Sequence, residues 1–355
     1  MLTFNRKELV RSLQAACKLI PAKEHNALLA CVCVSPFSIQ AFNDNTHLRL
    51  KCEPAFTDSQ TDTFLVPAHA LLKIVKGMAS ETVNLSETGS LIQIQGDFSS
   101  SLMLKENVNL ENFPLEDCGA LPLARIDLSP FQIQDVCDKV VPFTSNDTTR
   151  YALCNVMVKP TNQGYCFAGT DGHRLSKIDI EDPSEEKTVE FLISTQIMDV
   201  LGVLTKKTID KVSFRPGENV LFVEGPSFTM RKKTDDLRII DFQQVIPSSH
   251  ETTILASTKT WQNALKGAKG FETVRLECGS AMKLECQDKA GGTFATEFPC
   301  ESKGPNFVAG FCPKYLKEAV DCVEKSTFFM GFGDPNSPLT FVSGSWTHVI
   351  MPMRI

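Results

Sequence analysis

The 355-residue sequence predicts an α+β fold made of three repeated domains. Three observations support this prediction. A short apolar strand, a polar or proline break and a helix of about ten residues recur six times along the chain. A meander of three strands follows every second helix. The helical segments also carry a net charge opposite in sign to that of the remaining sequence.

The strand-and-helix repeats are regularly spaced. Their strands begin near Leu2, Phe64, Arg125, Phe191, Thr253 and Phe307. Their helices are expected to start near Lys7, His69, Phe131, Thr195, Thr260 and Pro313. Successive starts are about 53 to 65 residues apart, the kind of spacing typical of repeat architectures. Proline or a small polar residue at each helix entry suits the unpaired N–H groups of a first helical turn.

The meanders repeat as strand, tight turn, strand, glycine turn and aromatic-bearing strand. The expected tight turns and aromatic residues are Glu87–Gly89 with Phe98, Arg215–Glu218 with Phe228, and Asp334–Ser337 with Trp346. Two β-α-β units and one meander make one domain. The sequence therefore predicts three domains, at residues 1–122, 125–249 and 252–355. Stacked copies of this kind usually build a shared surface rather than one deep active site.

The composition is that of an ordinary globular protein, with 42% hydrophobic and 22% charged residues. No apolar run approaches the roughly 20 residues that span a bilayer, and Met1–Glu8 lacks the apolar core of a signal peptide. We therefore expect a cytoplasmic protein. The thirteen cysteines include no C-x-x-C, and those of the last domain are too scattered to predict a zinc site. Reduced, mostly buried thiols and no metal or other cofactor are expected.

The charge distribution indicates a phosphate-binding surface. The six helical segments sum to +8, whereas the chain has a net charge of −6, which leaves −14 for everything else. In the first helix, one face is apolar and the other polar: Leu9, Leu13, Ala16, Cys17 and Ile20 against Lys7, Arg11, Gln14 and Lys18. A basic lining in an acidic body attracts phosphates without reading bases. No aromatic side chain recurs on the polar faces of these helices for bases to stack on, so duplex DNA is a better partner than a single strand. The alternative is that the helices carry ordinary solvated lysines and bind no nucleic acid.

No catalytic motif is assembled: Walker A, G-x-G-x-x-G, G-x-S-x-G and H-E-x-x-H are all absent. The stretch Gly169–Ser176 does place Asp171, His173 and Arg174 close together. On a strand, Asp171 and His173 would share a face and Arg174 would point away, while Asp-Gly also suits a turn. This arrangement does not provide a nucleophile next to an oriented base, as a catalytic site would need. The competing hypothesis is an enzyme that uses His173. The apolar tail Val349–Ile355 suits adaptable peptide binding.

At these residues the sequence resembles a known family. TDGHRLS (Thr170–Ser176), preceded by RYALCNVMV (Arg150–Val158), and the ending MPMRI (Met351–Ile355) resemble the bacterial sliding clamp, the beta subunit of DNA polymerase III. The starting segment Met1–Gln14 and the segment Phe64–Val75 resemble the first domain of that family. The resemblance spans essentially the full chain, and the two motifs together are specific.

The resemblance implies a three-domain DNA-clamp fold in which each domain has two β-α-β-β-β units, with helices inside and sheets outside. Two chains would close head to tail into a homodimer ring around duplex DNA. A clamp loader would open the ring. The ring would tether the DNA polymerase III alpha subunit, and other polymerases and repair proteins that carry clamp-binding peptides. The chain would then be a nucleoid-associated accessory subunit of a polymerase, with no active site of its own.

The resemblance also implies two sets of binding residues. The wall of a hydrophobic peptide cleft would be Leu153, Thr170, Gly172, His173, Arg174, Leu175, Val245, Tyr315, Met351, Pro352, Met353 and Arg354. Arg174 and Tyr315 are expected at the rim, where they could hydrogen-bond a peptide backbone. Candidate DNA contacts are the basic residues Lys7, Arg11, Lys18, Lys23, Lys73, Lys76, Arg150, Lys206, Lys207, Lys266 and Lys269.

The sequence departs from the family before Val245. The family usually has Phe-Pro-Asp-Tyr followed by Arg, whereas this chain has Ile239-Ile-Asp-Phe242 followed by Gln243-Gln244. The third and fourth helices are also weakly charged. An alternative function is therefore a clamp-fold protein of a phage or plasmid replication system with altered partner specificity. The binding of a host polymerase peptide would distinguish the two.

Overall fold

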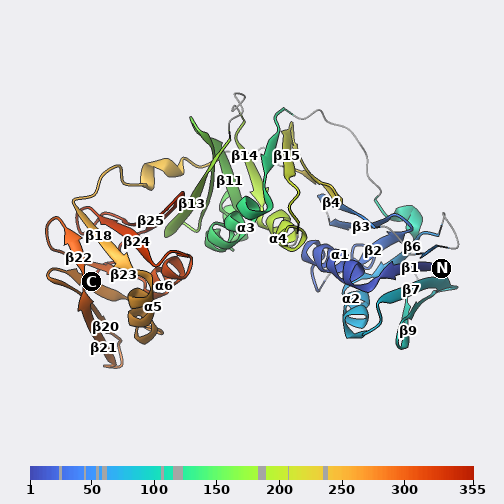
Figure 1. The fold of residues 1–355 in the computed structure, drawn as a ribbon, viewed down its shortest axis with the longest axis horizontal. Coiled ribbons are helices and arrows are strands. Elements are labelled where there is room, and N and C mark those ends of the chain that lie inside the picture. Colours follow the sequence, from blue (N-terminus) through green and yellow to red (C-terminus); the bar gives the residue numbers. More distant parts are fainter. Residues whose placement is uncertain are drawn as a thin grey trace. The chain divides into compact units, whose positions relative to one another are not determined.

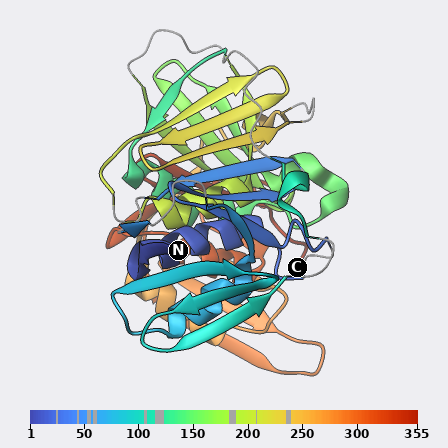
Figure 2. The same cartoon turned by 90° about the vertical axis from the view of Figure 1, so that its right-hand side faces the viewer.

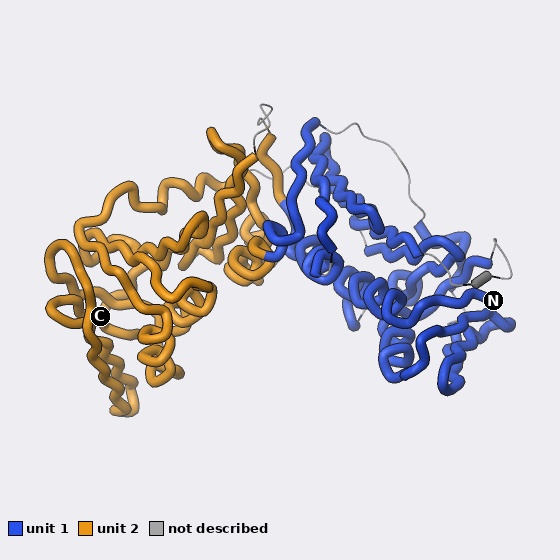
Figure 3. The backbone as a smooth tube through the Cα atoms, viewed as in Figure 1, with its two compact units in different colours: residues 1–134, 193–237 blue, residues 135–192, 238–355 orange. Residues whose placement is uncertain are grey.

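The computed structural model describes residues 1–23, 26–43, 45–52, 56–57, 62–104, 108–114, 123–182, 189–206, 208–234 and 239–355. The chain forms two compact units, each built from two separate stretches (Figure 3). Unit 1 comprises Met1–Gln134 and Ile193–Leu237, and unit 2 comprises Asp135–Leu192 and Arg238–Ile355. No helix among these described ranges has both the length and the apolar character that a bilayer crossing requires.

The six predicted helices are confirmed, each starting within two residues of its expected position. They are α1 (Arg6–Leu19), α2 (Ala68–Gly77), α3 (Pro130–Lys139), α4 (Thr195–Leu204), α5 (Thr258–Gly267) and α6 (Pro313–Asp321). Asn5 caps α1, because its Oδ1 accepts hydrogen bonds from the backbone N–H groups of Lys7 and Glu8 at 3.0 and 3.3 Å. Ser194 and Ser257 cap α4 and α5 in the same way.

Unit 1 contains two antiparallel sheets (Figures 1 and 2). The five-stranded sheet has the order β5 (Phe56–Thr57), β1 (Leu2–Asn5), β7 (Thr82–Thr88), β8 (Leu91–Gln95) and β9 (Ser99–Met103). The eight-stranded sheet has the order β10 (Ile126–Leu128), β15 (Val212–Gly217), β16 (Val220–Gly225), β17 (Phe228–Lys233), β4 (Thr46–Lys51), β3 (Ser38–Asn43), β2 (Cys31–Ser35) and β6 (Phe64–Pro67).

Unit 2 repeats this plan with a larger and a smaller sheet. The nine-stranded sheet has the order β14 (Phe191–Ser194), β11 (Asn155–Pro160), β12 (Gly164–Thr170), β13 (Arg174–Glu181), β26 (Trp346–Ile350), β25 (Leu339–Ser343), β24 (Thr327–Phe332), β18 (Thr252–Ser257) and β22 (Glu301–Lys303). The four-stranded sheet has the order β21 (Thr293–Pro299), β20 (Ala281–Gln287), β19 (Val274–Cys278) and β23 (Phe307–Phe311). Short 3-10 turns include η2 (Val141–Phe143), η3 (Thr148–Cys154) and η4 (Phe242–Val245).

The two units divide the predicted middle domain, 125–249, between them. Strand β17 pairs with β4, with Phe228 opposite Leu50, and β13 pairs with β26, with Arg174 opposite Ile350. These strands come from different sequence repeats, so each large sheet runs across a boundary that the repeats predict. The three-domain division remains a prediction from the repeats, whereas backbone pairing groups the chain into two units.

The third predicted tight turn is confirmed, since the Ser337 N–H donates to the Asp334 carbonyl at 2.9 Å between β24 and β25. The first was placed slightly too early: β7 continues through Thr88, and the turn is Gly89–Ser90, with Gly89 at φ 62°, where glycine is favoured. The second was placed too early. Strand β15 continues through Pro216 and Gly217, and the turn is Glu218–Asn219, with Asn219 at φ 55°. Asparagine tolerates this left-handed conformation better than most residues, and Pro216 fixes an extended φ inside the strand.

Two further expectations need correction. Phe98 does not lie on β9 but in the turn before it, which a hydrogen bond from Gly96 N–H to the Phe98 carbonyl closes. The cysteines are less buried than expected. Five of the described cysteines are buried and seven only half-buried, Cys17 among the latter. The thirteenth, Cys118, lies outside the described residues.

Candidate binding surfaces

Residues Asp171–His173 form the tight connection of the β12–β13 hairpin, between Thr170 at the end of β12 and Arg174 at the start of β13. Gly172 has φ +93°, which L-residues with a side chain rarely adopt. Asp171 closes the turn: its Oδ1 accepts the backbone N–H groups of His173 and Arg174 at 2.9 and 3.1 Å. Thr170 Oγ1 donates to the Arg174 carbonyl at 2.6 Å. These bonds hold one loop shape and leave the His173 side chain exposed.

Arg174 is the residue for which the sequence argument was wrong. Because the turn interrupts strand alternation, Arg174 does not point away from Asp171 but donates from Nε to Asp171 Oδ2 at 2.9 Å. It also pairs with Glu318 of α6, and only 8% of its surface is exposed. Burial opposes its charge, but the bonds to Glu318 and Asp171 outweigh that effect and raise its pKa.

Aromatic rings complete the surroundings of Arg174. The guanidinium carbon lies 4.8 Å from the ring centroid of Phe143 and 4.4 Å from that of Tyr315. Arg174 is therefore a structural centre that holds the turn, α6 and η2 together, and not a free rim donor. Tyr315 and Glu318 lie three residues apart on one face of α6, a spacing visible in the sequence, whereas Phe143 carries no local signal.

The C-terminal tail lies beside this turn, as the resemblance implied. Met351 N–H donates to the His173 carbonyl at 2.9 Å, and Met353 N–H donates to the Gly310 carbonyl at 2.8 Å. The tail thus extends the β13–β26 side of the nine-stranded sheet by one backbone hydrogen bond and then bonds to β23 of the four-stranded sheet. Met351 and Met353 remain 38% and 40% exposed, so their flexible apolar side chains are available to a ligand.

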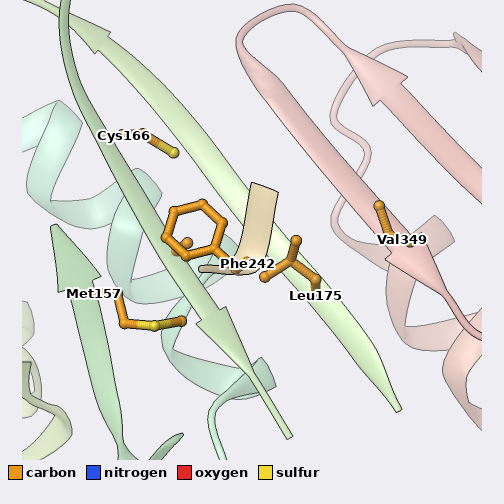
Figure 4. Packing of buried hydrophobic residues seen from close by; sticks show 6 residues of the cluster. Met157, Cys166, Leu175, Phe242 and Val349 are labelled. Atoms are coloured by element: carbon orange, nitrogen blue, oxygen red, sulfur yellow. The ribbon is translucent and has the colours of Figure 1, made fainter. Parts of the chain in front are cut away.

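The departing segment Ile239–Gln244 anchors the neighbouring residue Val245. Phe242 is 2% exposed and packs in a cluster with Met157, Cys166, Ala168, Leu175 and Val349, against which Ile239 and Ile246 also pack (Figure 4). Lys159 lies over the Phe242 ring, 5.3 Å from its centroid. Ile239 and Phe242 of the departing segment are therefore internal anchors, whereas Ile240 is 44% exposed. Gln243 and Gln244 are exposed, next to Val245, which is 42% exposed.

The predicted cleft residues thus fall into two groups. Leu175, Arg174 and Leu153 are buried and build the frame. The exposed or half-buried set is Thr170, Gly172, His173, Val245, Tyr315, Met351, Pro352, Met353 and Arg354. A separate hollow of about 640 Å³ lies farther along β12 and β13, between Gln163, Asp179 and Ser345, with Phe242 on its wall. None of the predicted cleft residues lines that hollow.

One buried group near this frame was not singled out from the sequence. His348 of β26 is 0% exposed, lies 4.5 Å from the Phe143 ring and stacks on Trp346 with centroids 5.6 Å apart. Among the described residues, neither of its ring nitrogens has a hydrogen-bond partner. Burial, with the nearby charge of Arg174, lowers the pKa of His348 to about 3, so the imidazole is neutral in the folded protein.

In unit 1, basic side chains gather on the helices. A hollow of about 740 Å³ is lined by residues of α1, α2 and the end of α4, and its basic members are Lys7, Arg11, Lys18, Lys76 and Lys206. Arg11 is half-buried and donates to the Leu204 carbonyl, so it also ties α1 to the carboxyl end of α4. The four lysines are exposed. The apolar face of α1 points inward, with Leu9, Leu13 and Ile20 at most 1% exposed.

The other candidate DNA contacts do not line this hollow. Lys23 and Lys73 are exposed in unit 1, and Lys266 and Lys269 are exposed at the end of α5 in unit 2. Arg150 of η3 donates to the Asp171 carbonyl at 2.9 Å, which places it against the hairpin turn. Lys207 lies outside the described residues. No group of three or more metal-binding side chains is arranged for a cation in the part of the chain that the structure describes.

Known proteins share both the sequence pattern and the fold. Residues 1–121 match the family model of the DNA polymerase III beta subunit, N-terminal domain. The beta sliding clamps of Synechococcus elongatus and Pseudomonas putida are 21% and 19% identical to this chain; the matches cover 100% and 99% of it and 99% of each relative.

Solved structures agree over the full length. The DNA polymerase III beta subunit of Thermotoga maritima superposes with a TM-score of 0.90 at 21% identity, covering 100% of this chain and 99% of that one. The subunit of Pseudomonas aeruginosa gives 0.87 at 17% identity, with complete coverage of both. The α+β clamp fold expected from the sequence is confirmed. Over its full length the chain is similar in sequence to beta sliding clamps, and its first 121 residues match the DNA polymerase III beta subunit family.

Proposed function

We propose that this protein is a DNA sliding clamp: two copies close head to tail into a ring around duplex DNA and make a bound polymerase processive. The partners are duplex DNA without sequence preference, a clamp loader, the DNA polymerase III alpha subunit, and other polymerases and repair proteins with clamp-binding peptides. The protein works in the cytoplasm, on the nucleoid. It uses no cofactor, because the ring holds DNA by topology and needs no chemistry of its own.

The gathering of basic side chains on the helices of unit 1 carries this proposal. Four exposed lysines and Arg11 line one hollow, although the chain as a whole has a net charge of −6. Lysine ammonium groups are mobile point charges, so they attract phosphates without fixing a register. A surface of this kind holds a duplex loosely and lets it slide. The acidic remainder of the chain repels DNA from the other faces.

Salt dependence tests this surface. Replacing Lys7, Lys18 and Lys76 by alanine removes three phosphate contacts, so the slope of log affinity against log salt concentration should fall by about 3. Fluorescence anisotropy with a labelled duplex at low salt measures the slope. The matched control replaces three exposed lysines outside the hollow, Lys51, Lys211 and Lys233. An equal change in both variants would refute the assignment of this surface.

Topological retention tests the ring. Protein loaded by a clamp loader onto a nicked circular plasmid should stay bound through gel filtration. It should be lost when a restriction enzyme linearises the plasmid, because a ring can then slide off an end. Retention on linear DNA would contradict sliding. If the protein is never loaded onto the circular plasmid in the presence of clamp loader and ATP, the proposal that it encircles DNA is contradicted.

Two edge strands are suited to closing the ring. Strand β9 has a described neighbour only in β8, and β21 only in β20, so each presents unpaired backbone groups. We expect the edge strand of one chain's first domain, about Ser100–Lys105, to pair with β21 of a second chain; Lys105 lies outside the described residues. Met103 is 70% exposed on β9. Met103→Asp should weaken the dimer in sedimentation velocity, whereas Ile209→Asp, also on an exposed apolar side chain, should not. A native protein that stays monomeric at micromolar concentration would contradict the ring.

The exposed part of the predicted cleft is proposed to bind partner peptides that carry Leu and Phe. Met351, Met353 and Val245 supply apolar contact, and the bond from Met351 to His173 fixes the tail beside the turn. Met351→Asp should weaken the binding of a fluorescent Leu-Phe peptide at least tenfold, by about 1.4 kcal/mol or more, since a carboxylate would be desolvated. Ile209→Asp is again the control. Unchanged peptide affinity in Met351→Asp would place the cleft elsewhere.

A clamp of a phage or plasmid replication system is the second candidate. The exposed Gln243 and Gln244 beside Val245 favour it, because the family usually has a basic residue at this point and a change of charge alters peptide choice. Immobilised peptides from the host polymerase and from mobile-element polymerases would decide the matter. Capture by the host peptide supports the chromosomal clamp, and capture by the mobile-element peptide alone supports the second candidate.

A further inference from the structure

We propose that Cys278 and Cys300 form a reversible dithiol–disulfide pair that a peroxide oxidises. The two sulfur atoms lie 4.0 Å apart, within a thiol–thiol hydrogen bond. A disulfide needs about 2.05 Å, and the remaining distance of about 2 Å is within reach of small side-chain rotations. Both residues belong to unit 2. This inference concerns a modification site and does not depend on the proposed function.

The fold brings these cysteines together from separate strands. Cys278 is the last residue of β19 and lies opposite Met282 of β20. Cys300 follows Pro299, the last residue of β21, which lies opposite Ala281. The chain then crosses from β21 to β22, over the end of the β19–β20 hairpin. Ser302 Oγ donates to the Gly279 carbonyl at 3.5 Å, which holds the crossing segment against that hairpin.

The two thiols differ in how readily they ionise and in how exposed they are. The hydrogen bond from Cys300 lowers the pKa of Cys278 in spite of burial. This hydrogen bond favours the thiolate form of Cys278, which is the reactive form. Cys300 keeps its proton and is half-buried, whereas Cys278 is 1% exposed, so a small oxidant approaches the Cys278 thiolate from the Cys300 side. By contrast, burial raises the pKa of Cys33 to about 11 and of Cys166 to about 12, which leaves both as inert thiols.

The chemistry balances with hydrogen peroxide as oxidant. The Cys278 thiolate attacks one peroxide oxygen, the O–O bond breaks, hydroxide leaves and Cys278 becomes a sulfenic acid. The Cys300 sulfur then attacks the Cys278 sulfur, the S–S bond forms, the S–O bond breaks and water leaves with the Cys300 proton. In total, two thiols and one peroxide give one disulfide and two waters. A dithiol reductant reverses the reaction by exchange.

The test treats the full-length folded protein with limiting hydrogen peroxide at pH 7.5. Remaining thiols are then alkylated under denaturing conditions, and proteolytic peptides are analysed by mass spectrometry. We expect a cross-linked peptide that joins Cys278 to Cys300 within one chain and disappears after treatment with dithiothreitol. It should form at least about tenfold faster than oxidation of Cys33 or Cys166, since those sites hold almost no thiolate.

Two variants keep the proposal refutable. In Cys300→Ser, no cross-link can form, and Cys278 should accumulate as a sulfenic acid that dimedone labels. In Cys286→Ser, which removes a buried thiol of the neighbouring strand β20, the cross-link should form as in the native chain. Oxidation of Cys278 and Cys300 no faster than that of Cys166 would overturn the proposal. So would a cross-link found only between chains, or a Cys300→Ser chain that folds but gives no dimedone adduct.

Discussion

The buried imidazole of His348 predicts a specific loss of stability in mild acid. In the folded protein it is neutral down to its pKa of about 3, because it is fully buried and near Arg174. In the unfolded chain its pKa returns to about 6.5. As the pH falls below 6.5, the unfolded state binds a proton that the folded state does not. Protonation therefore favours unfolding, and the penalty grows until the pH reaches the folded value.

The magnitude follows from these two values. Between pH 7.5 and pH 4.5, linkage gives a loss of about 2.5 kcal/mol from this residue alone. Because pH 4.5 lies well above the folded pKa, the result depends mainly on the unfolded value. His348→Leu removes the titrating group. Any constant effect of the substitution on packing cancels when the same variant is compared at the two pH values.

Urea unfolding followed by tryptophan fluorescence is a suitable assay. The chain has two tryptophans, Trp261 and Trp346; both are buried, both lie in unit 2, and Trp346 stacks on His348. The stability loss of the native protein between pH 7.5 and pH 4.5 should exceed that of His348→Leu by about 2.5 kcal/mol. His173→Leu, at an exposed histidine of the same unit, should lose as much as the native protein. If His348→Leu and the native protein lose equal stability, the assignment of a neutral buried imidazole is refuted.

Three further changes test the packing and the turns. Phe242→Ala empties a site that is 98% buried and should cost about 3 to 5 kcal/mol in the same tryptophan assay, whereas exposed Gln243→Ala should stay within about 0.5 kcal/mol. Gly172→Ala places a side chain on a residue with φ +93° and should lower the free energy of unfolding by about 1 to 2 kcal/mol. An unchanged urea midpoint would show that the loop adopts another shape. Asn5→Ala should cost about 1 kcal/mol by far-ultraviolet circular dichroism, since two backbone donors lose their acceptor, while Asn5→Asp should keep most of that stability.

Local chemistry made the elements readable from the sequence. The repeating apolar pattern predicted the start of all six helices to within two residues. The polar side chain of Asn5 marks the start of α1, because it can accept hydrogen bonds from N–H groups of the first helical turn. The resemblance to the clamp family rested partly on a short motif whose turn needs specific residues: glycine at a positive φ and Asp171 to close the backbone. Backbone geometry of this kind is set by neighbours in sequence.

Long-range contacts decided the rest. The pairing of β17 with β4 and of β13 with β26 divides the middle repeat between two units, and no local pattern encodes which strands meet. The burial of Arg174 could not be predicted from the sequence, because Glu318, Phe143 and Tyr315 pack against it from other elements. In the same way, Cys278 and Cys300 looked scattered along the chain and meet only where a crossing segment covers a hairpin end. A sequence specifies its turns and caps through adjacent atoms, whereas burial, charge pairing and thiol reactivity depend on atoms that only the folded chain brings together.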